Sequence, residues 1–234
     1  MQVAVIQSNY IPWRGYFDFI NSVDTFVIYD DVQFSKGSWR NRNKVKFRNE
    51  TKWITLPVKI NLGMLINEVK INNSKDWKKE HADLFKLSLS HAPNYKEAIE
   101  LWDEGVNKST EYLSELNEHM MKTICSYMGI STKFVRSEKY NLSGTKTDRL
   151  MDLFTKLDCT SYLSGPAADD YLDFEHFRNN KIALKYKSYD YNPYPQHDGF
   201  EFNGGVSIID LIANTGKQAL IHCTSKSTNQ IIVE

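Results

Sequence analysis

Two short apolar runs near the start of the chain limit its fold more than any other feature of the sequence. The first covers residues 3–6 (Val-Ala-Val-Ile) and the second covers residues 26–29 (Phe-Val-Ile-Tyr). Both are rich in β-branched or aromatic residues and both are followed by polar residues, which is typical of buried strands. The segment between them suits a short helix that begins near Gly15. A strand, helix and strand of this length predict a parallel pair joined by a right-handed crossover.

The same alternation returns in the second half of the chain. Residues 133–136, 161–165 and 182–187 predict strands, and the alternating pattern of the last one is typical of an edge strand. Residues 75–128 show apolar side chains at helical spacing and predict a helical insertion or subdomain. We therefore expect residues 1–234 to form a single α/β domain, with a Rossmann-like, open and mainly parallel sheet of about five strands.

Residues 40–58 have a different pattern, with a cation at every second position: Arg40, Arg42, Lys44, Lys46 and Arg48. A period of two places these side chains on one face of a strand. We expect a β-hairpin that projects from the sheet, with Val45 opposite Ile54 and Asn43 opposite Leu56. The basic face is either a site for an anionic ligand or a solvated surface. Its position directly after a polar loop favours the ligand site.

The composition narrows the classes of partner. Lys plus Arg and Asp plus Glu both number 29, so no overall field attracts DNA or anionic lipid, and anion recognition has to be local. The three cysteines are far apart and odd in number, which argues against disulfides and structural zinc and for a reducing compartment. The sequence contains neither a signal peptide pattern nor a long apolar run. We therefore expect a cytoplasmic protein without a membrane span.

Polar and aromatic residues gather where the predicted strands end. Ligands of open α/β sheets bind in the crevice beyond the carboxyl ends of the strands, so we expect the site there. The candidate substrate-binding residues after the first two strands are Gln7, Asn9, Tyr10, Trp13, Tyr16, Gln33, Trp39, Arg40, Asn41, Arg42, Asn43 and Lys44. Candidates on two later segments of the rim are Ser164, Gly165, Tyr171 and Gln196.

Three residues are candidates for acid–base chemistry. Asp30 and Asp31 end the second predicted strand, and His197 is a loop histidine flanked by polar groups. Adjacent residues of a strand point to opposite faces, so at most one of the two aspartates faces the site. Capping of a loop by the aspartates and a surface position for the histidine are the alternatives. The sequence shows no metal-ligand spacing and no catalytic triad, so we expect no metal site.

The turn at residues 7–18 contains one glycine, which excludes the glycine-rich phosphate-binding motifs. Its Trp13-Arg14-Gly15-Tyr16 superficially resembles the H-x-G-H turn of nucleotidylyltransferases and class I synthetases, with the glycine present and both histidines absent. An ATP-dependent amide ligase that works through an acyl adenylate therefore remains an alternative. Only that alternative would require ATP and Mg²⁺; otherwise the sequence leaves the cofactor open.

The first forty-odd residues resemble a known family. The resemblance rests on residues 7–17 (Gln-Ser-Asn-Tyr-Ile-Pro-Trp-Arg-Gly-Tyr-Phe), 29–34 and 39–44, and continues in Ser164-Gly165, Tyr171-Leu172, Tyr194-Pro195-Gln196 and residues 207–210. The chain is similar to the WbqC-like protein family, which occurs in bacterial gene clusters that build O-antigens, lipopolysaccharide and related surface polysaccharides. The activity suggested for the family is the transfer of glycine or another amino acid onto a sugar.

This resemblance and the residues together predict a transferase that attaches an amino acid (glycine) or a small acyl group to a nucleotide-linked or lipid-linked sugar. We expect Arg40, Arg42 and Lys44 to contact a pyrophosphate. We expect Trp13, Tyr16 or Trp39 to stack on a base or sugar. Asp30, Asp31 or His197 would take the proton of the attacking amine. Besides the adenylate ligase, a non-catalytic sugar-nucleotide-binding protein is the other alternative.

Overall fold

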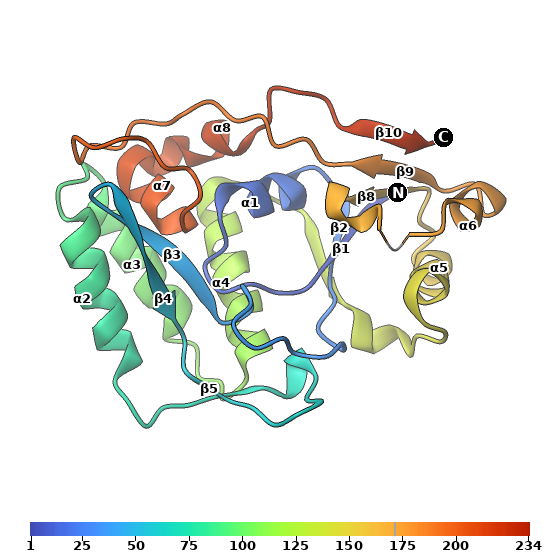
Figure 1. The fold of residues 1–234 in the computed structure, drawn as a ribbon, viewed down its shortest axis with the longest axis horizontal. Helices are drawn as coiled ribbons and strands as arrows, with labels where there is room; N and C mark the ends of the chain where they lie inside the picture. Colours follow the sequence, from blue (N-terminus) through green and yellow to red (C-terminus); the bar gives the residue numbers. More distant parts are fainter. Residues whose placement is uncertain (171) are drawn as a thin grey trace.

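The computed structural model describes residues 1–170 and 172–234, so the predicted substrate-binding residue Tyr171 lies outside the described residues. A six-stranded sheet crosses the molecule, and helices lie on both of its faces (Figure 1). The strands follow the order β10-β9-β8-β1-β2-β7. Their bounds are β1 Gln2–Ile6, β2 Thr25–Ile28, β7 Lys133–Arg136, β8 Ser161–Ser164, β9 Ala183–Tyr186 and β10 Gln230–Val233.

The sheet confirms the predicted α/β class and the mainly parallel pairing. All neighbouring strands from β9 to β7 are parallel, and β10 alone pairs antiparallel, along β9. The prediction that residues 182–187 form an edge strand is wrong, because β10 lies outside β9. The alternation there has another cause: Leu184 and Tyr186 are buried, whereas Ala183 and Lys185 on the other face are only half-buried.

Two hydrophobic cores form because successive strand residues point to opposite faces of the sheet. One core joins Ala4 and Phe26 to helices α1 (Arg14–Asn21) and α4 (Leu113–Met128). The other joins Val3 and Val27 to helices α5 (Lys146–Lys156) and α6 (Phe174–Asn179). The sheet is therefore the middle of three layers.

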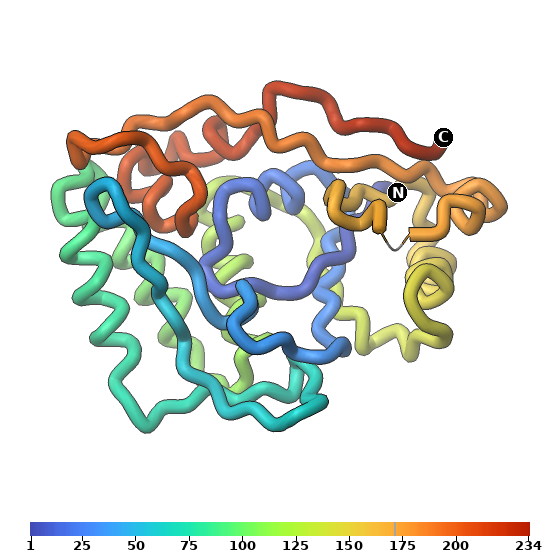
Figure 2. The backbone as a smooth tube through the Cα atoms, viewed as in Figure 1, coloured from blue at the N-terminus to red at the C-terminus, as the bar shows by residue number. Residues whose placement is uncertain are grey.

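The remaining elements lie between and after the strands of the sheet, and Figure 2 follows the backbone through them. Two helices of the predicted insertion precede α4 and two further helices follow β9, and α3 packs against both α4 and α7. Their bounds, with the short strands and the 3₁₀ helices, are β5 Val58–Lys59, η1 Ile66–Glu68, β6 Lys70–Ile71, α2 Trp77–Leu89, α3 Tyr95–Val106, η2 Ser137–Tyr140, η3 Pro166–Ala168, α7 Ile208–Thr215, η4 Gly216–Gln218 and α8 Ala219–Cys223.

Helices α7 and α5 begin in different ways. The Ser207 hydroxyl accepts a hydrogen bond from the amide of Ile209 at 3.2 Å and caps α7, as its sequence predicts. The pattern Thr145-x-x-Asp148 is typical of a capping box, but none forms here, because the Thr145 side chain makes no capping hydrogen bond. The next residue, Lys146, has a φ of 49°, so α5 begins from a left-handed residue rather than from ordinary capping geometry.

The predicted hairpin consists of β3 (Arg42–Phe47) and β4 (Glu50–Thr55). Its register differs from the prediction by two residues, since Val45 lies opposite Lys52. The cause is a two-residue turn at positions 48 and 49, in which Arg48 adopts a left-handed φ of 57°. A shift of two preserves the face of every side chain, so Val45 and Ile54 are still both buried.

A chain of buried polar groups fastens the hairpin to the helices behind it. The Trp102 indole donates to the Tyr10 hydroxyl at 3.2 Å, and that hydroxyl donates to Nδ1 of His81 at 2.9 Å. The imidazole donates from Nε2 to the carbonyl of Thr55 at 3.1 Å. In this arrangement the ring is neutral, and burial lowers the pKa of His81 to about 4.

This lowered pKa predicts a specific dependence of stability on pH. Between the ordinary pKa of 6.5 and about 4, the unfolded chain binds a proton at position 81 and the folded chain does not, so stability falls as the pH falls. Unfolding in urea at pH 7 and pH 5 should show His81 contributing about 2 kcal/mol to that loss. His81→Gln should abolish this contribution, and the exposed His91→Gln should keep it. Equal pH dependence in both variants would contradict the assignment.

Candidate functional site

The order of the strands creates a topological switch between β1 and β8. From β1 the chain builds β2 and β7 on one side, and then crosses over to build β8 and β9 on the other. Because these strands are parallel, the ends of β1 and β8 meet at one edge of the sheet, next to Gln7 and Gly165. The crevice at such a point is the usual ligand site of open α/β sheets.

A pocket of about 560 Å³ lies at this switch, and we call it the switch crevice. The central strand of a parallel sheet is normally covered on both faces, yet Val5 and Ile6 are only half-buried because the crevice opens beside them. The side chains that give the crevice its polar and aromatic character are Gln7, Tyr29, Lys146, Tyr162, Ser164 and Tyr189.

A second pocket of about 320 Å³, the hairpin pocket, is also lined by residues of loop 7–13. Its walls are Asn9, Pro12, Trp13, Trp39, Asn43 and Gly205. Asn43 fixes the loop against the hairpin, because its amide nitrogen donates to the carbonyls of Tyr10 at 3.2 Å and Ile11 at 2.9 Å. Ile11 has a φ of 38°, an uncommon conformation for a β-branched residue that this clamp helps to hold.

The indole of Trp13 links the two pockets. It lines the hairpin pocket, and its centroid lies 5.6 Å from the ring of Tyr189, which lines the switch crevice. The indole packs directly over Gly15, where a Cβ atom would meet the ring at 2.3 Å. Glycine at position 15 therefore makes room for the Trp13 ring.

Arg14 ties the start of α1 to the segment that carries Gly205. It is 5 % exposed, and its guanidinium donates to the carbonyls of Asn192 at 2.7 Å and His222 at 3.2 Å. The rings of Tyr191, Tyr194 and Phe202 lie within cation–π distance of it, and burial lowers its pKa. This buried cation fixes one wall of the hairpin pocket.

The two candidate aspartates follow β2, which ends at Ile28, and their side chains have different partners. Asp30 is fully buried and accepts hydrogen bonds from the Ser8 amide at 2.8 Å and the Ser114 hydroxyl at 2.5 Å. Burial raises its pKa, and these hydrogen bonds together with the charge of Arg40 oppose the rise. Asp31 instead pairs with Arg149 at 2.6 Å and is 14 % exposed, between Tyr29 and Val32 of the crevice wall.

His197 lies on the exposed surface near the hairpin pocket. Its backbone amide donates to the Asn214 side chain at 3.0 Å, and its ring makes no hydrogen bond within the described parts of the chain. The neighbouring Gln196 is held inside by bonds to Asp210 at 2.8 Å and to the carbonyl of Asn203 at 3.0 Å. Neither residue lines the switch crevice or the hairpin pocket.

The structure places the other predicted binding residues in three different environments. Those that line a pocket are Gln7, Asn9, Trp13, Trp39, Asn43, Ser164 and Gly165. Tyr10, Tyr16 and Asn41 are buried and engaged with the protein: the Tyr16 hydroxyl donates to the carbonyl of Gln7 at 2.8 Å, and the Asn41 amide donates to that of Leu56 at 2.9 Å. Gln33 is exposed, and its backbone bridges to Leu65.

The predicted basic face is not uniform. Arg40 donates to the side chain of Asn9 and lies in the field of buried Asp30. Arg42 and Lys44 lie over the ring of Trp53. Lys46 is sealed inside, where it pairs with Asp198 at 2.9 Å.

Sequence reasoning missed Tyr29, Lys146, Tyr162 and Tyr189 in the crevice and Trp53 on the hairpin. Tyr189 follows β9, so the expectation that ligands bind beyond the carboxyl ends of the strands could have identified it. Lys146 opens a helix and has no such signal in the sequence.

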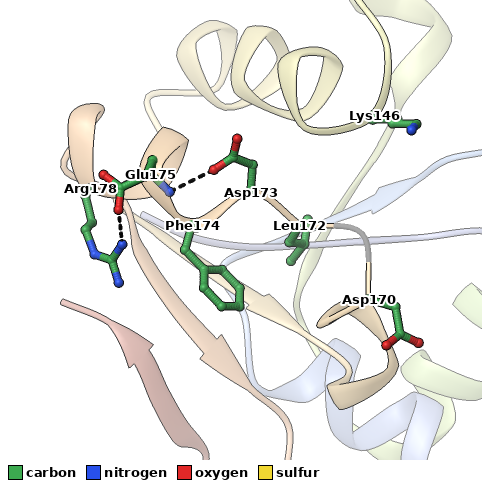
Figure 3. Close-up of a pocket in the computed structure, with 7 residues that line it drawn as sticks. All are labelled: Lys146, Asp170, Leu172, Asp173, Phe174, Glu175 and Arg178. Carbon is green, nitrogen blue, oxygen red and sulfur yellow. Dashed lines mark hydrogen bonds and ion pairs between the residues drawn. The ribbon is translucent and has the colours of Figure 1, made fainter.

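A third hollow, of about 590 Å³, is lined by Lys146 at the start of α5, by Asp170 and by residues in and before α6 (Figure 3). The Arg178 guanidinium pairs with Glu175, and the Asp173 carboxylate accepts from the Glu175 amide at 3.0 Å. The charged side chains of this hollow thus partly neutralise one another or bond to the backbone beside them. Within residues 1–170 and 172–234, no group of three or more His, Cys, Asp or Glu side chains could hold a metal ion. No helix in these ranges is long and apolar enough to cross a membrane.

Comparison with known proteins identifies the family to which the chain belongs. The family model of the WbqC-like protein family matches residues 7–222. The chain belongs to the WbqC-like protein family. It is also 41 % identical over 223 residues to the uncharacterised protein Rv1507c of Mycobacterium tuberculosis, which covers 93 % of this chain and 95 % of the relative. No solved structure matches the chain.

The matched range of the WbqC-like family contains every wall of both pockets except Val5 and Ile6. Loop 7–13, which contributes to both pockets, opens that range. The family match therefore covers the whole polar part of the candidate site.

The contact between Trp13 and Gly15 can be tested by a double-mutant cycle. Gly→Ala in a helix usually stabilises by about 1 kcal/mol, but here Gly15→Ala should destabilise by about 1–3 kcal/mol because the new methyl overlaps the indole. In a Trp13→Ala background the same change should become neutral or stabilising. Chemical unfolding of the four proteins measures the coupling. An unchanged effect of Gly15→Ala in both backgrounds would contradict the contact.

Proposed function

We propose that the protein attaches an amino acid such as glycine, or a small acyl group, to a nucleotide-linked or lipid-linked sugar in O-antigen and surface polysaccharide biosynthesis. One observation carries the proposal: loop 7–13 contributes to both the switch crevice and the hairpin pocket, and the Trp13 ring of one pocket contacts the Tyr189 ring of the other. A ligand with a nucleotide end and a sugar end needs two connected pockets of this kind.

The switch crevice suits the nucleotide. It lies where open α/β sheets bind nucleotides, and the rings of Tyr29 and Tyr189 offer faces on which a base can stack. Lys146 supplies a positive charge for the pyrophosphate. The sugar would then extend past Trp13 into the hairpin pocket. We expect this chemistry to take place in the cytoplasm, where nucleotide sugars are made.

The transfer itself needs a proton acceptor. The attacking nitrogen or oxygen of the sugar forms a bond to the acyl carbon, and the bond from that carbon to the donor's leaving group breaks, with its electron pair departing on the leaving group. The proton of the attacking atom passes to a base. Of Asp30, Asp31 and His197, we favour Asp31. It is not itself a wall of the switch crevice, but Val32 next to it and Tyr29 two residues before it are, whereas Asp30 is fully buried.

Binding tests the proposal directly. A thermal-shift panel of UDP-, GDP- and dTDP-sugars, UDP, ATP and AMP, with and without Mg²⁺, should show stabilisation by one nucleotide sugar. The expected gain is about 2.7 kcal/mol at a hundredfold excess over the dissociation constant. Lys146→Gln should weaken that binding about tenfold, since it removes a charge-assisted contact. Lys139→Gln, outside both pockets, should bind normally. Absence of stabilisation by every nucleotide sugar would contradict a nucleotide-linked acceptor and would leave only the lipid-linked acceptor of the proposal.

A ligase that works through an acyl adenylate is the second candidate, because the position of the switch crevice equally suits ATP. Against it, the Trp13 indole covers the first turn of α1 at Gly15, where the related enzymes carry the H-x-G-H turn. This ligase would release AMP and pyrophosphate when given ATP, Mg²⁺, an amino acid and an acceptor sugar. Chromatographic detection of AMP would favour the ligase, and transfer without AMP favours the transferase. Binding without any turnover would indicate a non-catalytic protein.

A further inference from the structure

Two exposed tryptophans stand side by side on the hairpin. Trp39 precedes β3 and Trp53 lies on β4, and each is 44 % exposed. Their ring centroids are 5.3 Å apart and the ring planes are inclined by 43°. Large aromatic side chains that meet on a surface are typical of binding sites. We call Trp39, Trp53, Arg42 and Lys44 together the hairpin platform.

Two cations lie over one ring of this pair, that of Trp53. The guanidinium carbon of Arg42 lies 4.0 Å from the Trp53 centroid, and the Lys44 ammonium lies 5.1 Å from it. Across residues 1–170 and 172–234 neither cation forms an ion pair, and Nε of Arg42 is buried without a hydrogen-bond partner. Lys46, the next cation on that face, differs because Asp198 neutralises it. The hairpin platform therefore has charge available for an anion.

The hairpin platform continues the proposed substrate path. Trp39 forms a wall of the hairpin pocket together with Trp13, and Trp13 contacts Tyr189 of the switch crevice. Ring contacts therefore join Tyr189 to Trp13 and Trp39 to Trp53, and the hairpin pocket lies between these two pairs. Pyranose rings stack their C–H faces on indoles and leave their hydroxyls in water, so this arrangement of rings matches the shape of a saccharide.

We propose that the hairpin platform binds an anionic saccharide, whose sugar rings stack on Trp39 and Trp53 while its anionic group contacts Arg42 and Lys44. Arginine forms paired, charge-assisted hydrogen bonds with a carboxylate or a phosphate, so the anion is a sugar acid or a sugar phosphate. The inference rests on the proposed function, because it names the class of sugar that the protein accepts. It predicts that a neutral saccharide of the same size binds more weakly.

The indole N–H signals of the five tryptophans provide the readout in ¹H–¹⁵N NMR spectra. Trp39 and Trp53 should shift in a saturable way on addition of trigalacturonic acid or glucose 1-phosphate. Trp77 and Trp102, which are 3 % and 2 % exposed, should not move and serve as internal controls. Maltotriose is the neutral probe, and single Trp→Phe variants assign the signals.

Charge-removing variants test the anion contact. Arg42→Gln and Lys44→Gln should each weaken binding of the charged probes about tenfold and leave maltotriose unaffected. Lys52→Gln is the matched control, because exposed Lys52 pairs with Val45 in the register and so lies on the opposite face of the hairpin. It should bind the charged probes normally.

The outcomes separate the sources of the anion and the two proposals. Binding of trigalacturonic acid alone supports a sugar acid, binding of glucose 1-phosphate alone supports a sugar phosphate, and binding of both supports recognition of either. If Trp39 and Trp53 stay unmoved by both charged probes, or maltotriose binds as tightly, the inference is overturned. Trp53→Ala distinguishes the proposals, because nucleotide-sugar stabilisation through the switch crevice should persist in that variant even where the hairpin platform fails.

Discussion

The buried carboxylate of Asp30 is the interaction on which the candidate site depends. It lies at the end of β2 and accepts from Ser8 on the loop after β1 and from Ser114 on α4. A charge taken out of water costs free energy unless hydrogen bonds and nearby charge compensate it, and here the donors and the field of Arg40 offset part of that cost. Asn117 of α4 extends the network to the Ser8 hydroxyl at 3.1 Å and the Arg40 carbonyl at 2.8 Å. Strand, loop, helix and hairpin entrance are thus held together at one point.

The network around Asp30 holds loop 7–13 in place. This loop carries a large aromatic ring where other open α/β proteins carry a glycine-rich turn that contacts phosphate. Loop 7–13 is bulky, and its Trp13 indole occupies the space that a glycine-rich turn would leave open over α1. Asn43 and Arg14 hold the two flanks of the same region through bonds to backbone carbonyls. The binding surfaces therefore rest on a rigid frame, and the aromatic faces do not have to be ordered when a ligand arrives.

Sequence reasoning succeeded where a local rule decides the structure and failed where distant segments decide it. The apolar runs of β1 and β2 locate the centre of the sheet. Because ligands of open α/β sheets bind beyond the carboxyl ends of the strands, the sequence also locates Gln7 and Ser164 at the crevice. Tyr10 and Trp39 are the same kind of residue in the sequence, but only the fold determines that one is core and the other surface. Lys146 joins the crevice solely through the crossover from β7 to β8. The hairpin register was missed because a left-handed turn at Arg48 left no glycine as a signal.

The pairing of β1 with β8 also shapes how the molecule is made. During synthesis β1 emerges first, but its partner β8 follows only after the hairpin and the helices α2–α5. Until then one edge of the central strand has no hydrogen-bonding partner, a condition that favours association with other chains. Contacts of such long sequence separation also slow folding. The switch crevice therefore cannot form until β8 has been synthesised, and until then the free edge of β1 is open to association.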